Sequence, residues 1–134
     1  MQMPESYQRS AFNNLLGAEL LSLANGQSEV LLRMRAELGN RGGKLHGGAI
    51  FTLVDIAMGL ACSDSHGFDQ LSATLECKIN YLRAVSAGDV ICRAKVIHAG
   101  RRTLVLEADV LQGEQLVAKA QGTFAMVKTR EVQA

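Results

Sequence analysis

The stretch from residue 47 to about residue 63 constrains the fold more than any other part of the chain. It reads Gly-Gly-Ala-Ile-Phe-Thr-Leu-Val-Asp-Ile-Ala-Met-Gly-Leu-Ala-Cys, with apolar side chains at most positions. A helix that is hydrophobic on all sides must be enclosed by other parts of the protein. The nearly uncharged part, 49–62, is interrupted by Asp55 and is shorter than the ~20 residues that span a bilayer. We therefore expect a buried core helix and no membrane segment.

Downstream of this helix the hydrophobic pattern changes to a period of two, which is typical of strands. Candidate strands cover residues 74–83, 90–98, 103–111 and 115–128. Turns at 99–101 and 112–114 join the last three strands, and each is expected to hold its glycine at a positive φ. One enclosed helix with several antiparallel strands indicates an α+β fold in which the sheet wraps around the helix.

The N-terminal third gives weaker signals. Pro4 begins a pattern of near-helical spacing, and we expect the resulting short helix to end at Gly17. Asn25-Gly26 is a turn pair. Residues 32–38 alternate apolar and charged side chains, which predicts a strand with one solvent-facing side.

Length and charge limit the classes of function. The 134 residues suit one domain, assigned to 1–134, with a frayed tail at 129–134. Fourteen Lys and Arg against thirteen Asp and Glu give a net charge of +1, which does not favour binding to nucleic acid or a membrane surface. The N-terminus lacks the pattern of a signal peptide, so a cytoplasmic protein is expected. Cys62, Cys77 and Cys92 lie in apolar surroundings, and we expect small buried side chains rather than a disulfide framework.

Asp55 is the principal candidate for chemistry. An ionised carboxylate in an apolar setting is costly unless it is paired or solvated. A distant arginine or the subunit surface would satisfy it; the alternative is a catalytic carboxylate in a cleft, with a shifted pKa. Its helical neighbours include no cation, and two of them, Met58 and Gly59, are expected to lie beside the substrate.

Gly47 and Gly48 open the expected helix. Helix N-termini carry unpaired N–H groups and a partial positive charge, which suits polarising a carbonyl oxygen. Two adjacent glycines are also typical of a simple turn. His46 before them could be a general base, a ligand or a side chain that orients the loop, and we favour the third. His46, His66 and His98 show no metal-ligand spacing, so no metal is expected.

Gly47 and Asp55 are eight residues apart, which corresponds to ~12 Å along one helix. A nucleophile or base and its oxyanion donor must both lie within ~3 Å of one reacting group. If both residues act in catalysis, Asp55 of one subunit faces Gly47 of another across a two-fold axis. The sequence thus predicts a composite site.

The run Asn40-Arg41-Gly42-Gly43-Lys44-Leu45-His46-Gly47-Gly48, followed by Asp55, resembles the hotdog-fold thioesterases of the phenylacetate-pathway (PaaI-like) type. The stretches 73–82 and 87–89 are also similar to that family, so that the resemblance covers the chain from about Leu16 to Lys128. It implies a sheet of about six antiparallel strands around the long helix. It also implies homodimers that usually pair into homotetramers.

The resemblance further implies hydrolysis of an acyl-CoA or aryl-CoA thioester to a free acid and CoA, with no cofactor apart from the CoA of the substrate. Asp55 would act as nucleophile or general base, and the Gly47 N–H of the facing subunit would polarise the carbonyl. Asn40 and His46 match positions that shape the loop. Thr74 matches the position that helps to place the attacking water, with Ser72 as the alternative.

The substrate contacts are less sharply defined. Arg101 and Arg102, at a hairpin tip, could hold CoA phosphates through charge-assisted hydrogen bonds or could be solvated tip residues. The full set of candidate substrate-binding residues is Gly48, Met58, Gly59, Tyr81, Arg83, Arg101 and Arg102.

Two other functions stay open at this point. A same-fold dehydratase or hydratase acting on acyl-CoA or acyl carrier protein needs a placed general acid–base pair, and His46 is not obviously placed for it. A non-catalytic acyl-CoA-binding module is the other, because fold does not fix function.

Overall fold

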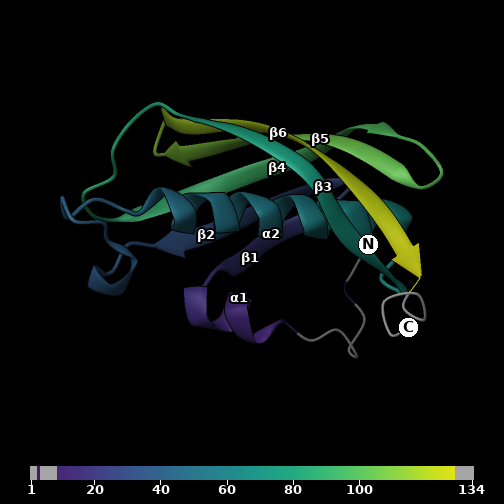
Figure 1. Ribbon diagram of the computed structural model, residues 1–134, viewed down its shortest axis with the longest axis horizontal. Helices are drawn as coiled ribbons and strands as arrows, with labels where there is room; N and C mark the ends of the chain where they lie inside the picture. Colours follow the sequence, from purple (N-terminus) through teal and green to yellow (C-terminus); the bar gives the residue numbers. More distant parts are fainter. Residues whose placement is uncertain (1–2, 4–8, 129–134) are drawn as a thin grey trace.

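The computed structural model describes Met3 and residues 9–128 of the chain. Six antiparallel strands form one sheet that curves around a long helix (Figure 1). The elements in chain order are α1 (Ala11–Leu16), β1 (Glu19–Ala24), β2 (Gln27–Arg33), the short 3-10 helix η1 (Ala36–Leu38), α2 (Gly47–His66), β3 (Gln70–Tyr81), β4 (Asp89–Ala99), β5 (Thr103–Gln112) and β6 (Gln115–Lys128). The strands lie in the order β1-β2-β4-β5-β6-β3. The expected α+β architecture is confirmed.

Helix α2 lies on the concave side of the sheet (Figure 1), and Leu53, Val54 and Ala57 on it are 0% exposed. It is three residues longer than expected and ends where the Gly67 N–H donates to Ser63 O at 2.7 Å. With 20 residues it is long and apolar enough to cross a membrane, but 56% of its most apolar window is buried inside this fold. The sheet that encloses it makes it the core helix.

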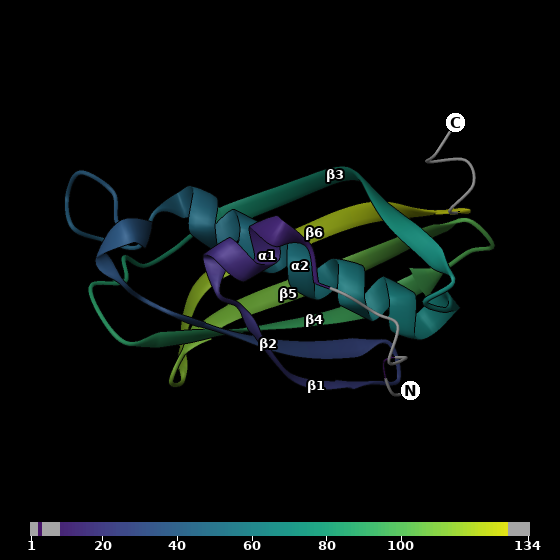
Figure 2. The same cartoon turned by 90° about the horizontal axis from the view of Figure 1, so that it is seen from below.

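Helix α1 begins later than the sequence suggested. Ser10 caps it, because its Oγ accepts the Asn13 N–H at 3.1 Å. Gly17 ends it with a φ of 82° and donates its N–H to Asn13 O at 2.9 Å, which confirms the predicted end. Residues 9 and 10 are not helical, and Pro4 lies outside the described residues. Figure 2 shows α1 lying over the face of α2 that the sheet leaves open.

The predicted strand 32–38 is wrong beyond Arg33, because the strand there, β2, covers Gln27–Arg33 and the chain then leaves the sheet. The Met34 N–H donates to Gly88 O at 2.9 Å. The Arg35 side chain turns away to donate to the carbonyl oxygens of Leu15 and Leu16, at 2.5 and 2.7 Å. Beyond Arg33 the charged position at Arg35 thus reflects contacts with α1 rather than with a neighbouring strand.

The turns agree with the sequence except at one glycine. Asn25 (φ 56°) and Gly26 (φ 69°) form the tight turn between β1 and β2, and Gly113 has the expected positive φ of 60°. Gly100 does not adopt a positive φ, so that expectation is wrong. A Cβ there would lie 3.1 Å from Thr103 O, and the turn therefore needs a glycine for space.

Candidate active site

Asp55 lies in the middle of α2, half-buried, and faces the edge strand β3. Thr74 Oγ1 donates a hydrogen bond of 2.6 Å to Asp55 Oδ1. Ser72 lies beside Gly59, one helical turn after Asp55 on α2, and a Cβ on Gly59 would lie 3.2 Å from Ser72 Oγ. Of the two hydroxyl candidates, it is thus Thr74 that contacts the carboxylate. Within the described part of the chain no lysine or arginine forms an ion pair with Asp55.

His46 is the N-cap of α2. Its Nδ1 accepts the Gly48 N–H at 2.8 Å, so the neutral ring carries its proton on Nε2. This contact fits a side chain that orients the helix start. The Gly47 N–H makes no hydrogen bond with any described residue, and it is therefore available to a substrate oxygen.

Asn40 closes the loop that leads into α2. Its Oδ1 accepts the N–H groups of Gly42 and Lys44 at 2.9 and 3.0 Å, and its own N–H donates to Lys44 O at 2.7 Å. The next turn is held by the His46 N–H, which donates to Leu38 O at 2.8 Å. Asn40 and His46 thus support the start of α2.

Tyr81 lies against the first turn of α2. Its hydroxyl donates to Gly47 O at 2.8 Å, and a Cβ on Gly47 would lie only 3.3 Å from its ring. Burial, with a smaller contribution from Cys77, raises the pKa of the Tyr81 hydroxyl.

A cavity of about 380 Å³, here the Tyr81 cavity, opens beside this contact. Gly47, Tyr81 and Arg83 line it together with Asn40 and Lys44. The Lys44 ammonium donates to Ser86 Oγ at 2.8 Å. The structure therefore gathers several predicted residues at the start of α2 and adds Lys44, which the sequence did not single out as a substrate contact.

Other predicted residues lie elsewhere. Met58 is 0% exposed and belongs to the core cluster, so its assignment as a substrate contact is wrong. Gly59 leaves room for Ser72 of its own chain, as described above. Arg101 and Arg102 are exposed in the turn between β4 and β5. That turn meets the C-terminal end of α2, where His66 Nε2 lies 2.8 Å from Gly100 O. In one chain these arginines are thus at the opposite end of α2 from Gly47, ~28 Å along the helix axis.

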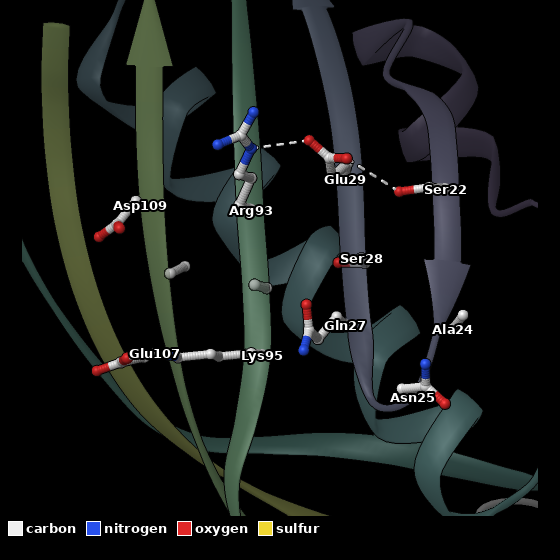
Figure 3. A pocket seen from close by; sticks show the side chains of 12 residues that line it. Ser22, Ala24, Asn25, Gln27, Ser28, Glu29, Arg93, Lys95, Glu107 and Asp109 are labelled. Carbon is white, nitrogen blue, oxygen red and sulfur yellow. Dashed lines mark hydrogen bonds and ion pairs between the residues drawn. The ribbon is translucent and has the colours of Figure 1, made fainter. Parts of the chain in front are cut away.

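The largest cavity described, about 550 Å³, is a shallow site on the outer face of the sheet, and Figure 3 shows α2 behind the strands that form it. Its charged groups are paired, the acidic groups being Glu29, Glu107 and Asp109, and Asp109 pairs with Lys119 outside the cavity at 2.8 Å. Arg93 Nε and Ser22 Oγ contact the two oxygens of Glu29 at 2.8 and 3.2 Å. Lys95 Nζ lies 3.2 Å from Glu107 Oε1. Because the sheet separates this cavity from Asp55, we do not assign it to the reaction.

With this geometry in place, residues 42–119 match the model of a family described as the thioesterase superfamily. The chain belongs to the thioesterase superfamily. The family resemblance that was identified from residues 40–48 and Asp55 is confirmed. The expected enzyme class, a thioester hydrolase, is confirmed as well.

Named relatives of this thioesterase include the acyl-coenzyme A thioesterase PaaI of Escherichia coli, which is 31% identical over 110 residues, 81% of this chain and 76% of the relative. The 1,4-dihydroxy-2-naphthoyl-CoA hydrolase of Listeria monocytogenes is 30% identical over 117 residues, 87% of this chain and 95% of the relative.

Solved structures agree with the fold of this thioesterase. A conserved protein from Pseudomonas aeruginosa is 61% identical with a TM-score of 0.87, over 89% of this chain and 95% of that one. A point mutant of the phenylacetic acid degradation protein PaaI from Thermus thermophilus is 32% identical with a TM-score of 0.80, over 87% and 98% of the two chains.

Proposed function

We propose that this thioesterase hydrolyses acyl-CoA or aryl-CoA thioesters to a free acid and CoA, with Asp55 as nucleophile or general base. The observation that carries the proposal is the position of Asp55, a half-buried carboxylate in the middle of an apolar core helix, with one oxygen held by Thr74 at 2.6 Å. The activities named for the relatives from Escherichia coli and Listeria monocytogenes support the same substrate class.

Two mechanisms of thioester hydrolysis are compatible with one carboxylate and one backbone N–H donor. As a general base, Asp55 takes a proton from water while the water oxygen attacks the thioester carbon. The Gly47 N–H stabilises the resulting oxyanion, which collapses and expels CoA as a thiolate that is then protonated. As a nucleophile, the Asp55 carboxylate attacks the same carbon and expels the thiolate. The mixed anhydride is then hydrolysed by water to the free acid and the original carboxylate.

The site is proposed to be shared between two subunits. Helix α2 runs without a break from Gly47 to Asp55, so these residues are ~12 Å apart in one chain. Support for a partner comes from β3, which forms an edge of the sheet and exposes Leu71 and Leu75 at 44% and 58%. An edge strand with exposed apolar side chains favours pairing with another chain. We propose that two chains form a homodimer across this edge and that two such dimers form the larger assembly. We also propose that the protein is cytoplasmic.

The CoA part of the substrate is proposed to contact the Tyr81 cavity. Lys44 and Arg83 provide positive charge there, beside the positive end of the α2 dipole. Arg101 and Arg102 stay candidates for CoA phosphates only as residues of a facing subunit, because in one chain they lie at the other end of α2.

Release of free CoA thiol from a panel of acyl-CoAs tests the proposal. Asp55→Ala should lower kcat by ~100-fold or more while circular dichroism stays unchanged. Glu114→Ala, at an exposed carboxylate between β5 and β6, is the control and should keep full activity. Near-normal turnover in Asp55→Ala would refute the role of Asp55. A wild-type protein that changes enoyl-CoA absorbance without releasing thiol would be a hydratase, and one that does neither would be a binding module.

A further inference from the structure

A second cavity lies on the other side of the first turn of α2 from the Tyr81 cavity. This α1 cavity measures about 330 Å³ and lies between α1, η1 and the start of α2. Its apolar lining comes from Phe12, Leu15, Leu16, Leu38 and Ala49. The sequence did not point to it, because its walls come from segments that meet only in the folded chain.

Two of the walls are unusually exposed for large apolar side chains. Phe12 is 58% and Leu15 is 70% exposed, while Leu16 beside them is 5% exposed and packs into the core. Ligand sites are concave, mostly apolar and typically ~300–1,000 Å³ in volume. The α1 cavity has that composition and a volume near the lower end of the range.

The two cavities on either side of the start of α2 differ in their linings. Gly47 lines the Tyr81 cavity together with the basic residues Lys44 and Arg83. His46 and Gly48 line the mainly apolar α1 cavity, whose charged residues are the oppositely charged Arg35 and Glu37. Neither glycine adds a side chain here, so the neighbours at this point are the His46 ring, which lies against Gly48, and the Tyr81 ring, which lies against Gly47. An acyl-CoA thioester has the same division, with a charged CoA on the sulfur side of its carbonyl and an apolar group on the other.

We propose that the α1 cavity holds the acyl group of the substrate when the thioester carbonyl is at the Gly47 N–H. The inference rests on the proposed function, and it replaces the expected location beside Met58, which the core occupies. The volume of the cavity favours an aryl group or a short to medium acyl chain over a long one. Phe12 and Leu15 would be the residues that determine this specificity.

The wall formed by α1 is held in place by the rest of the chain. Arg35 donates to the carbonyl oxygens of Leu15 and Leu16, and Arg9 donates to Ala18 O just beyond the helix. A Cβ on Gly17 would lie 3.3 Å from Arg35 Nη1, so the arginine packs closely on the end of the helix. A six-residue helix is too short to be stable alone, and these contacts fix it against α2.

The test compares wild-type protein with the double variant Phe12→Ala/Leu15→Ala, using acetyl-, hexanoyl- and benzoyl-CoA. Alanine keeps the helix propensity, and both side chains are largely exposed, so the fold should persist. We expect kcat/KM for hexanoyl- and benzoyl-CoA to fall by ~10-fold or more, and kcat/KM for acetyl-CoA to change by less than ~2-fold. Leu21→Ala on β1, where Leu21 is 51% exposed, is the matched control and should not discriminate between substrates.

Each other outcome overturns the inference. An equal loss for all three substrates, or no loss, would separate α1 from acyl recognition while leaving the thioesterase function intact. An equal loss together with a smaller assembly by light scattering would assign the α1 cavity to contact with a second copy of the chain. A wild-type protein that hydrolyses none of the thioesters would contradict the proposed function itself, and the inference with it.

Discussion

Thr74 Oγ1 donates a hydrogen bond of 2.6 Å to Asp55 Oδ1, and this contact joins the edge strand β3 to the middle of α2. The Thr74 side chain reaches the carboxylate because Ser72, Thr74 and Cys77 lie on the side of β3 that faces the helix. No other hydrogen bond to Asp55 is made by the described residues, which leaves Oδ2 for a water molecule or a thioester carbon.

Removing this hydroxyl should impair turnover without unfolding the protein. A hydrogen bond to a charged group contributes ~1.5–3 kcal/mol, so we expect Thr74→Val to lower kcat by ~10–100-fold. Thr74→Ser keeps the hydroxyl and should retain most of the activity. Thiol-release kinetics with thermal melts of both variants check this, and equal activity of the valine and serine variants would show that the hydrogen bond has no catalytic role.

A composite site predicts complementation between inactive subunits. Gly47→Pro removes the proposed donor N–H at the first helical position, where proline is tolerated. His46 has φ −64° and ψ 137°, which suits a residue before proline. Gly47→Pro and Asp55→Ala should each be inactive alone. Co-expressed with different tags, their random dimers should recover about a quarter of wild-type activity, since half of the dimers contain one intact site.

Co-expression distinguishes a shared site from a site within one chain. If the site were built within one chain, the mixture would not recover activity, because every subunit would lack either its donor N–H or its carboxylate. Tyr81, whose ring lies close to Gly47, must move slightly to admit the proline, so Gly47→Ala serves as a control that keeps the N–H and introduces the same crowding.

His46 should matter more for stability than for chemistry. His46→Ala removes the acceptor of the Gly48 N–H, and loss of an N-cap costs ~1 kcal/mol, or roughly 3–5 °C in Tm for a domain of this size. His46→Asn supplies another capping oxygen and should restore Tm. If His46→Asn were as inactive as Asp55→Ala, the imidazole would have to act directly in catalysis.

The buried thiol of Cys62 should make stability depend on alkaline pH. Burial, and secondarily the charge of Asp55, raises the pKa of the Cys62 thiol from 9.0 to about 12. The unfolded chain therefore loses this proton near pH 9 while the folded chain keeps it. The stabilisation is complete below pH 9 and is lost as the pH rises toward 12.

Urea unfolding of wild type and Cys62→Ala at about pH 8 and about pH 10.5 measures this effect. The wild type should lose more stability over the interval, by up to ~1.4 kcal/mol per pH unit above pH 9. Cys92, whose pKa is also raised by burial, is present in both proteins and does not contribute to the difference. Parallel pH profiles would contradict the assignment to Cys62.

The sequence predicts elements well where one pattern of burial persists. The alternation in β5 and β6 and the uniform apolarity of α2 each reflect a single packing environment, and the predicted start of both strands and the bounds of β6 agree with the structure. Strand β1 was missed, because its leucines do not alternate and a bulge between Leu20 and Ser22 shifts its register. The segment after Arg33 was misread as a strand because Arg35 makes its contacts with α1.

The candidate site likewise contains residues that the sequence could predict and residues that it could not. Asn40, His46, Gly47 and Asp55 lie on one continuous loop and helix, so their spacing in the sequence fixes their spacing in space. Thr74 and Tyr81 come from β3, and local spacing could not place them beside α2; for Thr74 the family resemblance supplied the expected position. Met58 was misassigned because a sequence does not show that this face of α2 turns toward the sheet. The lining of the α1 cavity depends on three separate segments and was not predicted.

The unbroken helix between Gly47 and Asp55 fixes the rotation of the two residues about the helix axis as well as the distance between them. Inserting or deleting one residue in this interval would rotate the carboxylate by ~100° about the helix axis, away from Thr74 and toward either the core or solvent. The loop at 40–44 and the turn at 113–114 can change length without such a rotation, because no helix transmits the change. The eight-residue interval is therefore a part of the chain in which the insertion or deletion of a single residue should abolish activity, because it changes both the rotation and the distance between Gly47 and Asp55.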